Sequence, residues 1–268
     1  MMQRHTGITT IALAAALLSA PIHAHVAHNE HCNINLDGSL DHQQGQLSID
    51  SDSLNATFNA SGDVLVDGQP LKLTDAQQEA AQAYYRNIVS AVPMTVSIAT
   101  DAITIAGTTV SEVFTELLGE DEDLSQEFDV FFADLQQRID SRYDNANGDF
   151  TIHASDLGHG DWIDQGWDEE FDAKVENLVS QSLGKILLSV GGDLFSGDQS
   201  IADFANRMSN FGETIEERVN ERAQSLEKQA DILCDILYQA DVAETELSQQ
   251  VSALSSLDIL TVNRNHAK

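Results

Sequence analysis

The chain has 268 residues, and its 44 acidic residues against 13 basic ones give a formal net charge of −31 at pH 7. An acidic field of this size repels phosphate backbones and anionic lipids, which makes nucleic acid and acidic membrane surfaces poor partners. The chain holds three prolines and no Gly/Ser-rich linker, so the composition favours one continuous domain.

Residues 1–24 have the order of a secretory signal peptide. Arg4 lies in a short basic segment, an apolar run covers residues 8–20, and Ala24 precedes the expected cleavage site. The run is too short to span a bilayer core of about 30 Å, and no later stretch reaches the ~20 apolar residues that a span needs. We therefore expect a soluble protein that is exported to the periplasm.

The two cysteines, Cys32 and Cys234, are expected to form a disulfide. Export takes the chain to an oxidising compartment, where pairing is favoured over the alternative of two unpaired structural thiols. A redox-active pair more typically has Cys-x-x-Cys spacing. A lipid anchor on Cys32 is not expected, because Asn29-Glu30-His31 are not the small and aliphatic residues that a lipoprotein signal places before its cysteine.

Residues 25–44 are assigned to a polar, histidine-rich leader, and residues 45–73 predict an antiparallel β-meander. The expected strands cover residues 46–49, 56–59, 63–66 and 70–73. Gly62 and Gly68 lie between the last three strands and supply the glycine that tight reversals need.

A helix is predicted to begin at Thr74, because Thr74 and Gln77 have the spacing of a capping box. Pro93 should end or kink this helix, since proline disfavours helical geometry at the residue before it. Residues 94–118 combine helical spacing of apolar residues with a high content of Thr, Ile and Val, which also suits a strand. We assign a helix to this segment.

The rest of the chain is predicted to be mostly helical. Helices are expected over residues 124–143, 168–190, 204–237 and 242–257, and a short strand at 150–153 should return to the meander. The helix at 204–237 would extend roughly 50 Å. Early strands and later helices indicate an α+β fold, in which the helical part 74–268 packs with the meander as one domain.

The start of the helical part also carries a family resemblance. The matching positions are Gly62, Val64, Gly68, Leu73, Gln77, Glu79, Ala80, Tyr84, Ser90 and Pro93. The segment resembles the YggN-like proteins, an uncharacterised exported family of Gram-negative bacteria. The resemblance implies the compartment, the extent of the chain, and one cysteine after the signal with another late in a C-terminal helix, as Cys32 and Cys234 stand in this chain. It implies no catalytic residues.

Three histidines at the expected mature N-terminus, His25, His28 and His31, are candidate metal ligands. Neutral imidazoles with this spacing on a flexible segment can bind Cu(II), Zn(II) or Ni(II), and cleavage after Ala24 would add the free α-amine of His25. The alternative is a disordered polar leader that holds no metal.

A second candidate site is the segment 153–161, which contains His153, Ser155, Asp156, His159 and Asp161. Such a set could hold a metal or a Ser-His-Asp array, although proximity in sequence is not triad geometry. The preferred interpretation is a polar loop in which Asp161 caps a helix.

The leading functional hypothesis is a non-enzymatic binding or accessory protein of the cell envelope, with an envelope protein or a small ligand as partner and no cofactor. It follows from strong fold signals without a catalytic signature. The first alternative is periplasmic binding of divalent copper or zinc through His25, His28 and His31. The second alternative is a hydrolase that uses the segment from His153 to Asp161.

Overall fold

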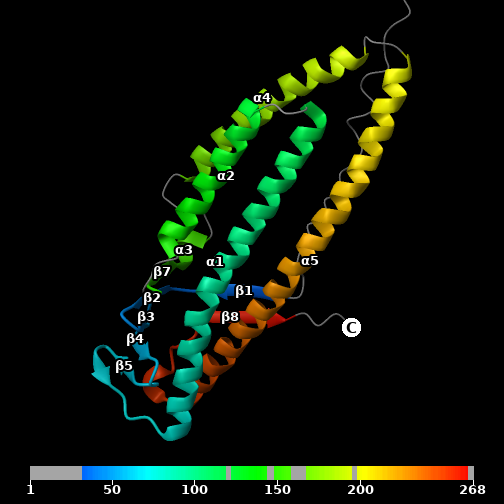
Figure 1. The fold of residues 1–268 in the computed structure, drawn as a ribbon. Helices are drawn as coiled ribbons and strands as arrows, with labels where there is room; N and C mark the ends of the chain where they lie inside the picture. The colour runs from blue at the N-terminus through cyan, green and yellow to red at the C-terminus, as the bar shows by residue number, and fades with distance from the viewer. Residues whose placement is uncertain (1–31, 119–121, 144–147, 158–166, 195–197, 265–268) are drawn as a thin grey trace, which may run out of the picture. The chain divides into compact units, whose positions relative to one another are not determined.

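The computed structural model describes residues 32–118, 122–143, 148–157, 167–194 and 198–264. These residues lie in one unit, His31–Lys268, and the unit Met1–Glu30, which contains the predicted signal peptide, lies outside them. The described residues form antiparallel strands near the N-terminus followed by long helices (Figure 1). The predicted α+β class is confirmed.

The larger of two sheets is antiparallel, with six strands in the order β6-β5-β4-β3-β2-β7. Its strands are β2 (Ser39–Gln43), β3 (Gln46–Ser51), β4 (Leu54–Asn59), β5 (Val64–Val66), β6 (Gln69–Pro70) and β7 (Phe150–His153). The return of β7 to pair with β2 is as predicted. The structure corrects the assignment of residues 25–44 to a polar leader, because Leu40 and His42 alternate with polar residues along β2 and are buried.

The reversals around β5 need glycine for two different reasons. Gly62 and Gly68 have positive φ values of 79° and 74°. A Cβ at Gly62 would lie 2.4 Å from the carbonyl oxygen of Gln78, whereas a Cβ at Gly68 would meet nothing within 4 Å. A side chain at either position would therefore be strained by the left-handed backbone, and a side chain at Gly62 would also collide with the backbone of Gln78.

We expect Gly68→Ala to lower the free energy of unfolding by about 1 kcal/mol, which is the left-handed strain alone. Gly62→Ala should cost about 2 kcal/mol, because the Gln78 backbone must also shift. Urea unfolding of the two variants under the same conditions measures the difference. Equal losses would contradict the close approach at Gly62.

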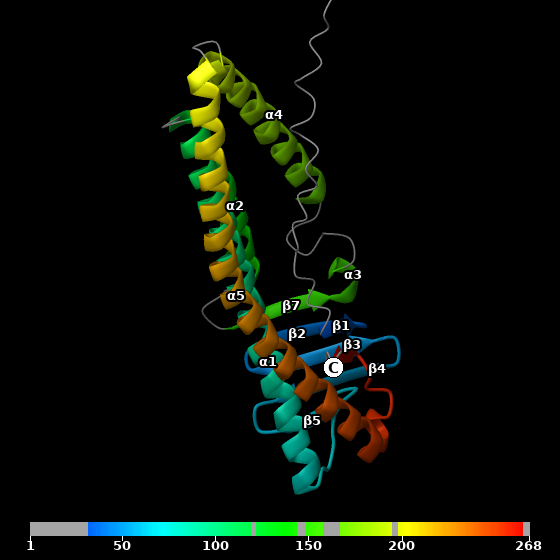
Figure 2. The ribbon, with the colours of Figure 1, turned by 90° about the vertical axis from the view of Figure 1, so that its right-hand side faces the viewer.

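The main core lies between the large sheet and parts of two helices, α1 (Asp75–Leu118) and α5 (Asp198–Gln250). Figure 2 shows these helices crossing beside the sheet. The buried side chains include Leu47, Ile49, Ala56 and Phe58 from the sheet, Ala81, Tyr84 and Ile88 from α1, and Ala240, Ala243 and Leu247 from α5. Phe58 and Tyr84 pack with ring centroids 5.2 Å apart. The alternation along β3 and β4 therefore supplies one wall of the core, and two helical faces supply the other.

Helix α1 begins as predicted and then continues further. The Thr74 N–H donates to Gln77 Oε1 at 3.0 Å, and the Gln77 N–H donates to Thr74 Oγ1 at 3.4 Å, which completes the capping box. The helix does not end at Pro93, and the helix assigned to residues 94–118 is confirmed. Val92 is buried in the main core and Val96 packs on a second cluster, so tertiary contacts hold the helix on both sides of the proline.

The second cluster joins α1 to α2 (Glu122–Tyr143) and α4 (Trp167–Leu194). Ile139 is its buried centre, and the half-buried side chains around it are Val96, Ala99, Ile103, Leu135, Tyr143 and Phe171. Within the described ranges, the segment Asp75–Thr115 of α1 is long and apolar enough to cross a membrane by length and composition. Of the 18-residue window that meets these criteria, 17% is buried, and parts of α1 pack in both clusters.

The C-terminal part differs from the prediction. The helices expected at 204–237 and 242–257 are one helix, α5, which ends at Gln250 and is followed by the 3₁₀ turn η1 (Ser252–Leu254) and strand β8 (Leu260–Arg264). Strand β8 pairs with β1 (Cys32–Leu36) in a separate two-stranded sheet, and neither strand was predicted. The predicted end of α4 at Gly191-Gly192 is also wrong, because α4 continues to Leu194. A one-turn helix, α3 (Ala154–Leu157), precedes α4 in the chain.

Candidate functional site

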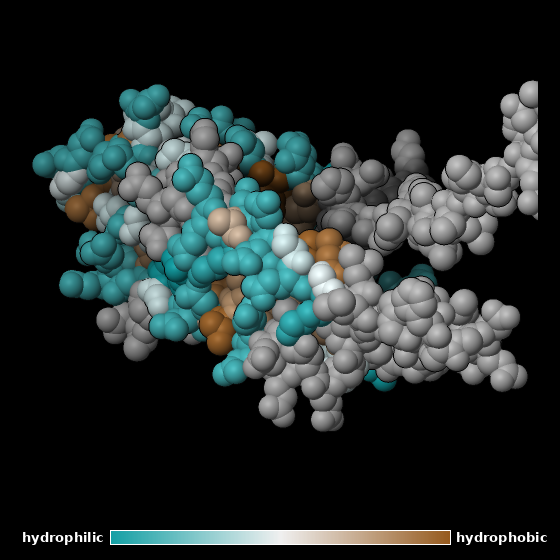
Figure 3. Space-filling model, turned by 90° about the horizontal axis from the view of Figure 1, so that it is seen from above, coloured by the Kyte–Doolittle hydropathy of each residue, from teal (hydrophilic) through white to brown (hydrophobic). Residues whose placement is uncertain are grey.

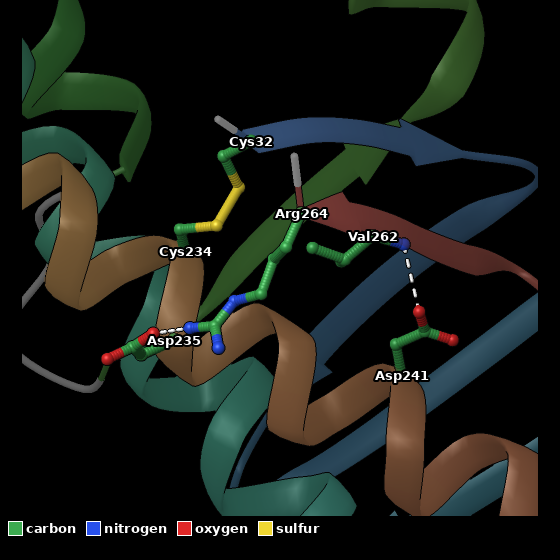
Figure 4. The surroundings of a disulfide bond; sticks show 6 residues. All are labelled: Cys32, Cys234, Asp235, Asp241, Val262 and Arg264. Carbon is green, nitrogen blue, oxygen red and sulfur yellow. Dashed lines mark hydrogen bonds and ion pairs between the residues drawn. A yellow bond between two sulfur atoms is a disulfide. The ribbon is translucent and has the colours of Figure 1, made fainter. Parts of the chain in front are cut away.

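The two cysteines form a disulfide between β1 and α5. The Cα atoms of Cys32 and Cys234 are 6.1 Å apart (Figure 4), so the predicted pair is present. Beside this bond, Arg264 of β8 pairs with Asp235 and lies over the ring of Tyr238 at 4.6 Å from its centroid, both residues being on α5. Since Cys234 belongs to the main core, the disulfide ties the small sheet to that core.

Two acidic side chains of α5 hold β8 through its backbone. Asp241 Oδ2 accepts a hydrogen bond from the Val262 N–H at 2.9 Å (Figure 4). Glu244 Oε1 accepts hydrogen bonds from the N–H groups of Ile259 and Leu260 at 2.6 and 3.0 Å. Through these three hydrogen bonds the two acids dock the C-terminal strand on the helix.

Glu244 is a buried acid whose ionisation is opposed by its surroundings. Its residue surface is 2% exposed, and burial raises the pKa of Glu244 to about 7, although its backbone donors act in the opposite direction. Burial and the nearby Glu244 charge in turn raise the pKa of Tyr84. Within the described part of the chain, neither Glu244 Oε2 nor the Tyr84 hydroxyl has a partner with hydrogen-bond geometry. The Tyr84 hydroxyl is a donor and can serve an ionised Glu244, so Tyr84 acts against burial and lowers the Glu244 pKa.

Acids with raised pKa values also occur in active sites, but Glu244 lines none of the three cavities described below. Its hydrogen bonds are to backbone groups of β8. We therefore assign Glu244 a structural role in holding that strand.

His42 on β2 is a second buried titratable residue. Its Nδ1 lies 2.7 Å from the carbonyl oxygen of Gly148, and its Nε2 lies 3.0 Å from the Tyr85 hydroxyl of α1. The Tyr85 hydroxyl also donates to the carbonyl oxygen of Gly45 at 3.1 Å. The imidazole ring stacks on Phe150 with centroids 5.3 Å apart. These contacts join β2, the start of β7 and α1, so His42 is occupied in holding the sheet together.

The segment predicted for a hydrolase begins at an exposed position. His153 lies on the rim of a cavity of about 330 Å³ that Asp149 and Thr151 also line. His159 and Asp161 lie outside the described residues. The Ser-His-Asp hypothesis therefore stays a prediction.

The proposed metal ligands His25, His28 and His31 also lie outside the described residues. Among the residues that are described, no group of three or more His, Cys, Asp or Glu side chains could hold a metal ion. Metal binding by the leader stays a prediction that concerns those histidines alone.

A groove of about 710 Å³ between α2 and α4 is the stronger candidate for a binding site. Val130 and Phe131 of α2 and Leu178 of α4 supply its apolar lining, and Val130 is 62% exposed. The polar side chains that complete the lining are Gln126, Glu127, Asp134, Lys174, Asn177 and Gln181. The volume lies in the range of small-molecule sites, about 300–1,000 Å³. Figure 3 shows apolar patches set among hydrophilic side chains at the helical end of the molecule.

A network of charges connects α2 and α4 beside this groove. Asp134 pairs with Lys174 at 3.0 Å and with Arg138 at 3.2 Å, and Lys174 also pairs with Glu170 at 2.9 Å. The Lys174 ammonium lowers the pKa of Asp134 and of Glu170. Glu170 and then Asp134 raise the pKa of Lys174. Exposed pairs of this kind contribute little to stability, but this network neutralises Lys174, the one cation among the described residues that line the groove.

A third cavity, of about 560 Å³, lies between α1 and α5 and is lined in part by Glu112, Phe211 and Arg218. Glu112 pairs with Arg218 at 3.3 Å and with Arg222 at 3.6 Å. These ion pairs hold the two helices together across the cavity. The groove between α2 and α4 has the more apolar lining among its named residues and is taken as the candidate site.

Sequence reasoning missed the groove, although two signals point to it. Val130 lies off the predicted inward stripe of its helix, which passes through Phe128 and Phe131, and an apolar residue outside the stripe can mark a second contact surface. Glu170 and Lys174 are four residues apart on one helix, the spacing at which opposite charges interact. Neither signal identifies which other helix completes the site.

The fold and this site define an α+β protein in which a groove between two helices is the candidate binding surface. The chain belongs to the family described as protein of unknown function (DUF2884), whose model matches residues 32–260. No curated protein and no solved structure matches the chain. The family match covers both cysteines, and the YggN-like resemblance itself stays a prediction.

Proposed function

We propose that the protein is an exported, non-enzymatic binding protein of the cell envelope that holds an amphipathic cation in the groove between α2 and α4. The observation that carries the proposal is the apolar lining of this groove beside an excess of acidic groups. Val130, Phe131 and Leu178 can cover an apolar chain. The proposal includes no reaction, since the buried Glu244 and His42 are both engaged in structural hydrogen bonds.

The charge of the groove favours a cationic ligand end. Among the described lining residues Glu127 and Asp134 are acidic and Lys174 is basic. Asp134 and Lys174 pair with each other, which leaves the charge of Glu127 in excess. The whole chain adds a field of −31 charges, which attracts cations and repels anions. The amide groups of the lining can accept hydrogen bonds from an ammonium group.

We expect Val130→Ser to weaken the binding of dodecylammonium, below its micellar concentration, by about tenfold, the value of one buried Val side chain. Isothermal titration calorimetry on the secreted protein measures this affinity. Val179→Ser is the matched control, because Val179 is an exposed valine of α4 that does not line the groove. Both variants should unfold at the same urea concentration as the unchanged protein.

Dodecanoate, with the same chain and the opposite charge, should bind at least tenfold more weakly than dodecylammonium. Equal binding of the two probes would refute the proposed ligand class. Equal effects of Val130→Ser and Val179→Ser would refute the proposed site.

A native mass spectrum of protein purified from the periplasm tests export and cleavage near Ala24. The same spectrum reports any metal bound by His25, His28 and His31.

A further inference from the structure

Among the residues that the structure describes, strand β1 is an edge strand with one open side. It pairs with β8 alone in its sheet, with Ile34 opposite Val262 and Asn35 opposite Thr261. The hydrogen bonds of β8 show which of these facing pairs are hydrogen-bonded to each other. Val262 and Leu260 donate their N–H groups to the acids of α5, so these groups face away from β1.

In an antiparallel ladder, hydrogen-bonded and non-hydrogen-bonded pairs alternate. Ile34 is therefore in a non-hydrogen-bonded pair, and its N–H and C=O face away from β8. The Asp37 N–H donates to the carbonyl oxygen of Ile259 at 2.7 Å, which fits the same alternation. The backbone groups of Asn33, Asn35 and Asp37 therefore face β8. Those of Cys32, Ile34 and Leu36 face the opposite side of β1.

The other side of this small sheet is closed by side chains. Asp241 and Glu244 occupy the outward N–H groups of β8. Pro70 lies in the edge strand β6 of the large sheet and has no N–H to offer. Proteins commonly protect edges with proline, lysine, bulges or a covering element. The sequence of β1, Cys-Asn-Ile-Asn-Leu, contains no proline and no charge.

The side chain of Ile34 is also incompletely covered. It shares one face of β1 with Cys32 and Leu36, which both pack against the main core. Ile34 itself is 43% exposed. A strand added at the open side of β1 would cover this side chain as well as the backbone.

We propose that the open side of β1 binds an extended, basic segment of a partner protein as an additional antiparallel or parallel strand. Backbone hydrogen bonds would supply affinity, and alternate side chains would supply selectivity. A second copy of this chain is disfavoured as the occupant, because two bodies of −31 charges repel each other. The acidic Asp37 at the end of β1 favours Lys or Arg in the partner, and Ile34 favours an apolar residue opposite it.

The test uses the secreted, disulfide-bonded protein and a capped peptide of alternating lysine and valine, with a glutamate-valine peptide of equal length as control. Amide hydrogen exchange should show the Ile34 and Leu36 amides unprotected in the free protein and protected at least tenfold by the lysine peptide. The Asn33 and Asn35 amides should be protected in both states. Protection of the Ile34 amide in the free protein, or no gain with the peptide, would overturn the proposal.

A substitution tests the same inference by affinity. Ile34→Pro removes an outward N–H and leaves the ladder to β8 intact, so it should weaken binding of a fluorescent lysine-valine peptide at least tenfold. Ile34→Val retains the N–H and the strand propensity, and should bind within about twofold of the unchanged protein. Equal binding of the glutamate-valine peptide would overturn the proposal that the partner segment is basic. Protection of the Ile34 amide that depends on protein concentration rather than on peptide would indicate a second copy of this chain and would overturn it as well.

Discussion

Replacing both Cys32 and Cys234 with serine should lower the free energy of unfolding by about 5 kcal/mol. The disulfide closes a loop between positions 202 residues apart, and the loss in chain entropy on cross-linking grows with loop length. In the described part of the chain, β8 is the one strand that pairs with β1. Urea unfolding of the double variant and of the oxidised protein, at one pH and one salt concentration, measures the change.

A reducing agent provides the matched control for this prediction. Reduction should destabilise the unchanged protein by the same amount as the double substitution, and it should leave the double variant unaffected. A change below 1 kcal/mol in both experiments would mean that the contacts of β8 with α5 hold the small sheet without the bond. Agreement between the two experiments separates the loss of the bond from any effect of the serine side chains.

The helices could be predicted from the sequence because their apolar spacing repeats over many turns. The stripe that includes Phe131 and Ile139 in α2 packs inward as expected. In α5 the same spacing runs on through Ala240, Ala243 and Leu247, so the helices predicted at 204–237 and 242–257 are one. Alanine adds little to an apolar pattern, and the acid Glu244 falls on the buried face, which concealed the join between the two.

The small sheet could not be predicted because its stabilising partners are distant in sequence. Each of β1 and β8 has five residues, and β1 has Asn33 and Asn35 at alternate positions. The contacts that hold them are the disulfide and the acids of α5, which local alternation does not reveal. Glu244 was the available signal, since an acid on an apolar helical face needs buried donors nearby.

The groove also depends on the tertiary arrangement. Val130 and Leu178 come from two helices between which β7 and α3 lie in the chain, and no local pattern brings them together. The charges that link α2 to α4 are spaced for contacts within each helix, but Asp134 and Lys174 interact between helices. The sequence could therefore suggest a binding protein from the absence of catalytic motifs, but not where it would bind.

Glu244 should make the protein less stable as the pH rises from about 4.5 to about 7. Its pKa in the folded protein is about 7 against an ordinary value of 4.5, so the folded state binds this proton more tightly than the unfolded chain. The stabilisation is complete below pH 4.5 and is lost as the pH passes the folded pKa. The shift corresponds to about 3 kcal/mol at 1.36 kcal/mol per pKa unit.

Glu244→Gln isolates this contribution from the other acids of the chain. The glutamine keeps a carbonyl oxygen for the N–H groups of Ile259 and Leu260 and cannot ionise. The stability of the variant relative to the unchanged protein should therefore rise by about 3 kcal/mol between pH 4.5 and pH 8, as measured by urea unfolding at several pH values. Glu246→Gln removes one exposed charge from the same helix and controls for net charge. A difference between Glu244→Gln and the unchanged protein that stays constant with pH would show that folding does not raise the pKa of Glu244, and would contradict the prediction.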